Sequence, residues 1–250
     1  MKAMVFAAGL GTRLRPLTND RPKALVTIGG RTLLEVTLAR LRSFGVNEAI
    51  VNVHHFADRI VDYLKANQNF GMRIEVSRED ELLDTGGGLK KAAWFFLEDA
   101  GDKDEPFIVH NVDVLSTIDL AHMARFHAEQ NALATLAVQL RESSRQLLFD
   151  EQGRLCGRRA GRDAEIEWAV STRQFEPLAF SGIHVLSPRI FDGLPEEGAF
   201  SIIPAYLRIA AQGEKIVAFR ANGSYWRDLG RPADLTEAEH DLAAGKYSLS

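Results

Sequence analysis

Hydrophobic residues in the first half of the chain alternate between two patterns, one typical of strands and one typical of helices. The segment 32–44 has helical spacing, with Thr32 and Glu35 placed as a capping box and Gly45 as a stop. The alternation predicts strands at 3–8, 48–53, 72–77 and 107–111, and helices at 32–44, 58–67 and 89–98. It indicates a mostly parallel α/β sheet, in which ligands bind at the carboxyl ends of the strands.

The pattern is less regular in the second half. It predicts helices at 119–130, at 202–211 and from Pro232 to about Gly245, and a strand at 134–140. Residues 147–155 are typical of a hairpin with Gly153 in its turn. A second hairpin is predicted where strands at 216–220 and 224–228 flank Asn222 and Gly223, because both residues tolerate positive φ. The charged, poorly periodic stretch 156–178 predicts strands and loops.

A loop rich in glycine and cations follows the first apolar run. Gly9 and Gly11 let backbone N–H groups approach an anion without interference from Cβ. Arg13, Arg15 and Lys23 supply fixed positive charge close by. A strand, a glycine turn and clustered cations together indicate a site for a polyphosphate.

Two common phosphate-binding motifs fit this loop poorly. The sequence GlyLeuGlyThrArgLeu begins like the dinucleotide fingerprint GxGxxG, but Leu14 takes the third glycine position and Pro16 interrupts the helix that the turn would open. The P-loop pattern GxxxxGK[ST] is absent from the segment. A Rossmann oxidoreductase is therefore a disfavoured alternative, distinguishable by NAD-dependent absorbance changes.

Composition is that of an ordinary globular chain. The 250 residues are 46% hydrophobic and 26% charged with a net charge of −4, so the chain has no nucleic-acid footprint. The single cysteine, Cys156, rules out an internal disulfide and is compatible with a reducing cytoplasm. The apolar run at 3–8 is shorter than the ~7–15 residues of a signal-peptide core, and no stretch approaches the ~18 apolar residues of a membrane span. We therefore expect a cytoplasmic protein that contacts neither nucleic acid nor a membrane.

Several motifs together resemble one enzyme family. They are AlaAlaGlyLeuGlyThrArgLeuArgProLeuThr at 7–18, ArgProLysAlaLeu at 21–25, ThrGlyGlyGly at 85–88, AsnValAsp at 111–113, PheSerGlyIleHisValLeu at 180–186 and TrpArgAspLeuGly at 226–230. In order and separation they resemble the sugar-1-phosphate nucleotidylyltransferases, and they span nearly the whole chain. The ThrGlyGlyGly segment and the short length are most similar to the N-acetylmuramate-1-phosphate uridylyltransferases and their near relatives.

The resemblance implies a fold and a reaction. The fold is the nucleotide-diphospho-sugar transferase type, a mostly parallel, Rossmann-like mixed sheet with a small β-rich sugar-side lobe. It would form a single domain over 1–250, with a nucleotide-binding half at 1–115 and a sugar-binding half at 116–250. In the reaction, a sugar 1-phosphate oxygen attacks the α-phosphorus of a nucleoside triphosphate and pyrophosphate leaves. Because the attacking phosphate is already largely dianionic at neutral pH, the enzyme's task is to position the reactants and neutralise charge.

Two cations and two carboxylates carry the implied chemistry. Arg13 is expected to stabilise the departing pyrophosphate, and Lys23 to bind the phosphates of the reacting pair. Two unit charges ~4 Å apart repel by roughly 4 kcal/mol at an effective dielectric of ~20, so a divalent cation between the reactants is an efficient remedy. Mg2+ commonly uses one or two carboxylates plus substrate phosphates, which suits Asp113 with Asp228 as metal ligands.

The resemblance also implies which residues bind the substrates. For the nucleotide these are Ala8, Gly9, Gly11, Thr12, Arg13, Lys23, Thr85, Gly86, Gly87 and Asn111. The ThrGlyGlyGly segment is expected to meet the nucleobase, because adjacent glycines let peptide groups approach a flat ring edge. For the sugar 1-phosphate the expected residues are Gln146 and Gly182.

The substrates are not fixed by the sequence. UTP is favoured by the resemblance alone, and GTP, CTP or dTTP with mannose, heptose or glucose phosphate are close alternatives. A catalytically inactive, nucleotide-sensing subunit is a further alternative, which would bind triphosphate tightly without turnover. Residues 141–178 do not follow the muramate-enzyme pattern, which leaves the sugar open. The oligomeric state is also open.

Overall fold

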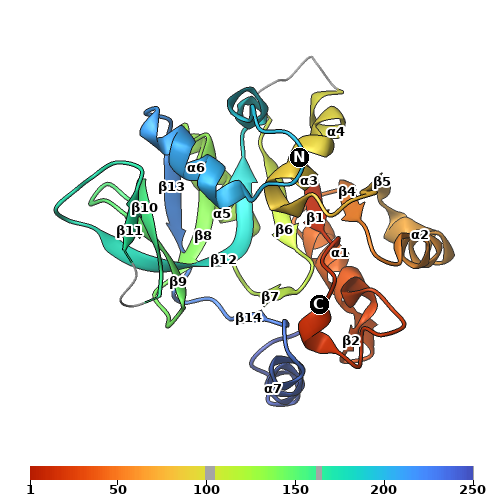
Figure 1. The fold of residues 1–250 in the computed structure, drawn as a ribbon. Coiled ribbons are helices and arrows are strands. Elements are labelled where there is room, and N and C mark those ends of the chain that lie inside the picture. Colours follow the sequence, from red (N-terminus) through yellow and green to blue (C-terminus); the bar gives the residue numbers. More distant parts are fainter. Residues whose placement is uncertain (99–104, 162–164, 250) are drawn as a thin grey trace.

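The computed structural model describes residues 1–98, 105–161 and 165–249, which form one large mixed sheet, two short sheets and helices on both faces of the large sheet (Figure 1). The strands of the large sheet are β1 (Lys2–Phe6), β4 (Glu48–Val53), β5 (Arg73–Arg78), β6 (Phe107–Asn111), β8 (Ala134–Gln139), β9 (Arg145–Phe149), β10 (Leu155–Ala160), β11 (Ile166–Trp168), β12 (Glu176–Leu186) and β13 (Ile216–Arg220). The short sheets pair β2 (Thr27–Ile28) with β3 (Arg31–Thr32), and β7 (Val114–Ser116) with β14 (Trp226–Asp228). The helices are α1 (Leu33–Ser43), α2 (Ala57–Ala66), α3 (Asp84–Lys91), α4 (Ala93–Leu97), α5 (Leu120–Gln130), α6 (Ile202–Ala211) and α7 (Pro232–Ala243), with short 3-10 segments at η1 (Thr12–Leu14), η2 (Lys23–Leu25), η3 (Gln68–Gly71) and η4 (Pro188–Gly193).

Four parallel strands organise the first half. β1 lies between β4 and β6 and runs parallel to both, and β5 pairs in parallel with β4. Phe6, at the end of β1, lies opposite Asn52 of β4 on one side and Asn111 of β6 on the other. The next two strands of the large sheet, β4 and β5, extend to one side of β1, and β6 lies on its other side. A crevice is therefore expected where β1 and β6 end.

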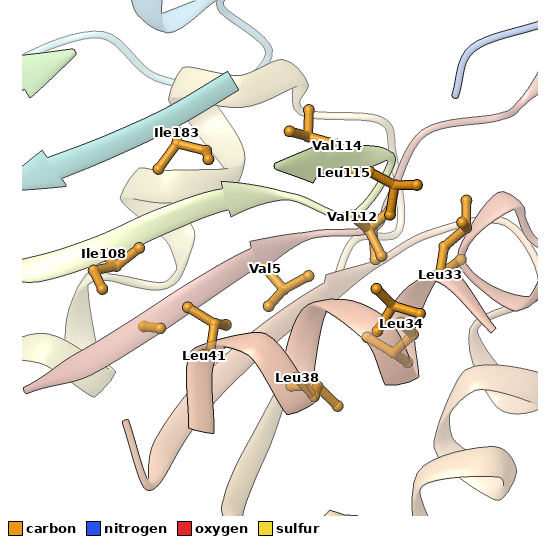
Figure 2. Packing of buried hydrophobic residues seen from close by; sticks show 14 of the residues in the cluster. Val5, Leu33, Leu34, Leu38, Leu41, Ile108, Val112, Val114, Leu115 and Ile183 are labelled. Atoms are coloured by element: carbon orange, nitrogen blue, oxygen red, sulfur yellow. The ribbon is translucent and has the colours of Figure 1, made fainter. Parts of the chain in front are cut away.

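The alternation of side chains along the strands divides the core into two layers. Val5 of β1 faces the layer that contains α1, whereas the adjacent Met4 faces the layer that contains α4. Figure 2 shows the first layer, in which Leu34 and Leu38 of α1 lie beside the sheet. Both leucines are fully buried, and each such burial stabilises the fold by roughly 1.5–3 kcal/mol. The parallel strands are therefore fixed from both faces.

Antiparallel pairing dominates the second half. The long strand β12 is antiparallel to β6, β8 and β9, and β9 and β10 form the predicted hairpin with Gly153 at φ +73° in its turn. β11 completes a small lobe at the opposite end of the sheet from β5 (Figure 1). The predicted α/β fold, with a Rossmann-like mixed sheet and a β-rich lobe, is confirmed. Residues 162–164 of the predicted irregular stretch lie outside the described residues.

Most predicted helices are present within one or two residues of their expected bounds. They are α1, α2, α5, α6 and α7. α1 begins as the capping box predicts, because Thr32 Oγ1 accepts a hydrogen bond from Glu35 N at 3.1 Å. Among the helices that the structure describes, none is long and apolar enough to cross a bilayer.

Two local predictions are wrong. The segments around Asn222 and Gly223 do not pair with each other: β13 joins β8 in parallel, and β14 joins β7. Ser224 N does donate to Ala221 O at 3.0 Å, but neither Asn222 nor Gly223 has positive φ. The helix expected at 89–98 instead begins at Asp84 and is broken at Ala92, between α3 and α4. In both cases pairing and packing with distant segments replace the local preference.

Candidate active site

The loop after β1 turns sharply at Gly11. This residue has φ +63°, and a Cβ there would lie 3.1 Å from Thr18 Cγ2 and 3.2 Å from Lys23 Cβ, so glycine fits best. Thr18 Oγ1 donates a hydrogen bond to Gly11 O at 2.8 Å, which holds the turn. Gly9 differs, because a Cβ there would meet no atom within 4 Å. Its backbone therefore borders open space.

A cleft of about 620 Å3 occupies this space, at the carboxyl ends of the parallel strands. Most residues predicted to bind the nucleotide line it, together with the predicted metal ligand Asp113: Ala8, Gly9, Gly11, Thr12, Arg13, Lys23, Thr85 and Asn111. The cleft thus gathers the glycine loop, both predicted catalytic cations and one carboxylate. Leu10 and Leu82, both partly exposed, also border it and supply apolar surface.

Gly86 and Gly87 do not line the cleft. Both N–H groups donate to Phe200 O, at 2.8 and 3.2 Å. A Cβ on Gly86 would overlap the ring of Phe200, and one on Gly87 would overlap Gly198 O. These glycines therefore permit close packing of α3 against the segment before α6. Of the ThrGlyGlyGly segment at 85–88, Thr85 alone borders the cleft.

Sequence reasoning missed two polar residues in the cleft wall, Asn52 and Glu79. Asn52 Oδ1 accepts from Ala7 N at 2.8 Å, and its Nδ2 donates to Glu79 Oε1 at 2.6 Å. Glu79 Oε2 in turn accepts from Leu83 N at 3.0 Å. This chain of bonds ties together the ends of β1, β4 and β5. Their positions at or just after the ends of predicted strands were the available signal, because the carboxyl ends of parallel strands border the crevice.

The two predicted metal carboxylates are brought together by the ladder between β7 and β14. Asp228 lies opposite Val114, the residue after Asp113. Leu229 N donates to Asp113 O at 2.8 Å, which extends the ladder past the two carboxylates. Two side chains 115 positions apart in sequence therefore meet in one place. The strand β7 was not predicted, so the sequence pattern alone gave no physical reason for this meeting.

Cations surround the two carboxylates. Lys23 Nζ forms an ion pair with Asp113 Oδ2. A Cβ on Gly230 would overlap Asp228 and come within 2.7 Å of Arg13 Nη2, so Arg13 lies next to Asp228 across this glycine. Burial raises the pKa of Asp228 and the charge of Asp113 raises it further, while Lys23 and Arg13 act in the opposite direction.

This donor set fits a divalent cation. Burial and the nearby Asp113 disfavour the ionised form of Asp228, and positive charge between the two carboxylates would favour it. Mg2+ prefers oxygen ligands. Within residues 1–98, 105–161 and 165–249, no cluster of three or more His, Cys, Asp or Glu side chains is arranged for a metal. Asp113 and Asp228 would therefore share such an ion with oxygens of a bound substrate.

A second cleft of about 1020 Å3 adjoins the first and shares Arg13 and Asn111 with it. Its lining includes Asp228 and both predicted sugar-binding residues, Gln146 and Gly182. Gly182 has φ +73°, and a Cβ there would come within 2.8 Å of Asn111 Nδ2, so this glycine lets β12 pack directly on the Asn111 amide. Apart from Gly86 and Gly87, the predicted residues thus fall into two adjoining clefts that meet at the carboxylates.

Arginines form much of the second cleft, and sequence reasoning missed them as a group. They are Arg13, Arg141, Arg145, Arg158, Arg159 and Arg231. Arg141 stacks on Trp226, with its guanidinium carbon 3.6 Å from the ring centroid, and Trp226 Nε1 donates to Ser181 O at 2.8 Å. The ArgArg pair at 158–159 was visible in the sequence, but only the pairing of β9, β10 and β11 places it beside Gln146.

Known proteins resemble this chain in sequence. The family model described as nucleotidyl transferase matches residues 2–148. The chain is 36% identical to an N-acetylmuramate alpha-1-phosphate uridylyltransferase of Caulobacter vibrioides, over 96% of each chain. It is 30% identical to a mannose-1-phosphate guanyltransferase of Yarrowia lipolytica over 94% of this chain, which spans 62% of that relative's length.

Solved structures share the fold. A UDP-glucose pyrophosphorylase complexed with UDP-glucose aligns with a TM-score of 0.76 at 20% identity, over 98% of both chains. At this identity the likeness concerns the fold alone. The sequence match to the relative from Caulobacter vibrioides carries more, because it reaches 36% identity over nearly the whole chain. This match and the family model show that the chain belongs to the nucleotidyl transferase family and is a sugar-1-phosphate nucleotidyltransferase.

Proposed function

We propose that the protein transfers UMP from UTP to a sugar 1-phosphate, giving a UDP-sugar and pyrophosphate. The observation that carries this proposal is the junction of the two clefts. The glycine loop borders one cleft, Gln146 and Gly182 border the other, and Asp113 and Asp228 meet between them. A triphosphate in the first cleft and a sugar phosphate in the second would bring their phosphates to the carboxylates and cations.

The residues at the junction divide the work of phosphoryl transfer. Arg13, next to Asp228, is proposed to stabilise negative charge on the departing pyrophosphate. Lys23, already paired with Asp113, is proposed to hold the α-phosphate and the attacking phosphate in line. Asp113 and Asp228 would hold Mg2+, which would neutralise charge on the phosphate oxygens when bound. No protein nucleophile is needed, because the attacking phosphate is already anionic at neutral pH.

One observation supports uridine as the base, and a second favours uracil, guanine or thymine over cytosine and adenine. The relative from Caulobacter vibrioides, 36% identical, is named a uridylyltransferase. In addition, Glu79 borders the nucleotide cleft and is only 5% exposed. Its carboxylate oxygens retain lone pairs beyond those used by Asn52 and Leu83, and they accept hydrogen bonds only. Such a group suits a ring N–H donor, which uracil, guanine and thymine carry; cytosine and adenine carry N–H donors only on an exocyclic amino group.

A substrate panel tests this proposal. Purified protein with MgCl2 is incubated with UTP, GTP, dTTP, CTP or ATP and with a series of sugar 1-phosphates, and pyrophosphate release is measured. UTP is expected to give the highest kcat/KM and CTP and ATP the lowest. A higher kcat/KM with GTP or dTTP would overturn the uridine assignment but keep the reaction class. Tight triphosphate binding without pyrophosphate release would favour a nucleotide sensor.

A further inference from the structure

The second cleft, which borders the predicted sugar-binding residues, carries an excess of positive charge. The cleft is lined by six arginines and three carboxylates, Asp228, Glu165 and Glu167, an excess of three positive charges. Asp228 belongs to the junction, and Glu167 Oε2 is paired with Arg158 Nε at 2.6 Å. Arg145 and Arg159 on the β9–β10 hairpin are thus left largely uncompensated within the described part of the chain.

Arg159 is the most telling of these side chains. It is half-buried, and its Nη2 donates to Gln146 Oε1 at 2.8 Å. Its Nε is buried without a hydrogen-bond partner among the described residues. A guanidinium held against a neutral amide, with one buried donor unused, pays for desolvation without recovering it from a carboxylate. The amide nitrogen of Gln146 is also a donor. The buried Nε is out of reach of a molecule in the cleft, but Arg159 and Gln146 both line the cleft. There the charged guanidinium and the amide N–H groups of Gln146 have no acidic partner among the described residues.

The position of this pair separates it from the reacting phosphates. Arg159 lies opposite Gln146 on β9, and the next residue, Leu147, lies opposite Leu178 on β12. Gly182 packs on Asn111 at the junction of the two clefts. Leu178 lies four residues before Gly182, which corresponds to roughly 13 Å of extended strand. In the proposed function the 1-phosphate is held at the junction by Lys23, beside Asp113. The Arg159–Gln146 pair must therefore face another part of the sugar.

We propose that the sugar 1-phosphate carries a second anionic group, a carboxylate or a further phosphate ester, and that Arg159 binds this group with Gln146 beside it. The inference rests on the proposed function, because it names the class of sugar that the second cleft accepts. Guanidinium groups bind carboxylates and phosphates in a bidentate manner, so a single arginine provides both affinity and orientation. In this account Arg159 determines specificity and takes no part in the chemical step.

Matched pairs of sugars test the proposal. N-acetylmuramate 1-phosphate differs from N-acetylglucosamine 1-phosphate by a substituent that bears a carboxylate, glucuronate 1-phosphate differs from glucose 1-phosphate by one carboxylate, and glucose 1,6-bisphosphate differs by one phosphate. With the preferred triphosphate, kcat/KM is expected to be about tenfold to a hundredfold higher for the anionic member of at least one pair, as a charge-assisted hydrogen bond would give. The pair that shows the preference identifies carboxylate or phosphate as the group.

Variants assign the preference to Arg159. Arg159→Gln should reduce the preference to near one by lowering kcat/KM for the anionic sugar only. Gln146→Glu, which places a carboxylate against Arg159 with little change in shape, should also reduce the preference for the anionic sugar and serves if Arg159→Gln does not fold. Arg154→Gln is the control, because Arg154 lies in the same hairpin, pairs with Asp150 and does not line the cleft. It should keep the full preference.

Two results would overturn the inference. One is a wild-type enzyme with equal kcat/KM for the neutral and the anionic member of every pair. The other is an equal loss for both members in Arg159→Gln and Gln146→Glu, which would make Arg159 a ligand of the shared 1-phosphate. In either case pyrophosphate release continues and the proposed function stands. Absence of pyrophosphate release with every sugar and triphosphate would instead contradict the proposed function.

Discussion

The parallel and antiparallel halves of the molecule contribute to the site in different ways. In the parallel half, Gly9, Asn52 and Asn111 lie at or just beyond the carboxyl ends of neighbouring strands, where the fold itself makes a crevice. In the antiparallel half, Gln146 and Arg159 lie within strands, and their meeting depends on the register of β9 and β10. The first arrangement follows from the order of elements along the chain. The second depends on which strands pair and where the pairing begins.

The largest expected effect tests whether the two halves share one reaction centre. Asp113→Asn and Asp228→Asn should each lower kcat by about a thousandfold or more. Loss of a charge proposed to bind the metal removes several kcal/mol of transition-state stabilisation, and each 1.36 kcal/mol changes the rate about tenfold. Circular dichroism should show an intact fold in both. Asp62→Asn, a change on the exposed face of α2, is the control. If only Asp113→Asn were inactive, the centre would belong to the parallel half alone.

Lys23 tests the charge balance on the parallel side. Lys23→Ala should lower kcat by about a hundredfold, because one cationic donor to the reacting phosphates is lost and Asp113 loses its ion-pair partner. Binding of uridine, which has no phosphate, should change little when measured by calorimetry. Lys65→Ala, at the exposed end of α2, should leave both values unchanged. A variant with normal kcat would remove Lys23 from the reaction.

Gly182 tests how the antiparallel half positions a residue of the parallel half. Gly182→Ala should lower the free energy of unfolding by about 1–2 kcal/mol, because alanine is strained at a φ of +73°. The overlap of the new Cβ with Asn111 should cost about 1–3 kcal/mol more and displace the Asn111 side chain. Gly153→Ala is a close match, since Gly153 has the same φ but no atom within 4 Å of its Cβ position. Urea unfolding compares the two. Equal losses of stability, with normal activity in both, would show that the contact with Asn111 is unimportant.

The smallest effect concerns acid stability in the second half. His127 is 3% exposed, and its Nδ1 lies 2.9 Å from Thr135 Oγ1. Burial lowers the pKa of His127 to about 4, with Arg189 adding to this. Below the usual pKa of about 6.5 the unfolded chain binds a proton at His127 that the folded chain does not, so His127 alone should lower the free energy of unfolding by about 1 kcal/mol between pH 6 and pH 5. In urea titrations, the free energy of unfolding of His127→Gln should fall by about 1 kcal/mol less than that of the wild type between pH 6 and pH 5. An unchanged pH dependence would contradict a neutral, buried His127.

The comparison also explains what could be predicted from the sequence. The glycine loop could be predicted, because it follows an apolar run that had to be a buried strand, whereas the role of Asn111 came from family resemblance. The pairing of Asp113 with Asp228 came from family resemblance, since the short strand β7 that causes it has no recognisable pattern. The hairpin around Asn222 was wrong because β13 pairs with β8 instead of β14. Gly86 and Gly87 were expected to face a base, but their N–H groups bond Phe200 O, a partner that only the tertiary fold reveals.

The central claim is that Asp113 and Asp228, one from each half of the molecule, hold the metal at which the two substrates meet. A crystal grown with MnCl2 and a non-hydrolysable UTP analogue tests it most directly, because Mn2+ replaces Mg2+ and is located by anomalous scattering. The account predicts an anomalous peak between the two carboxylates, in contact with the α-phosphate of the analogue. A bound analogue with no peak there, or with Mn2+ held by other residues, would contradict it.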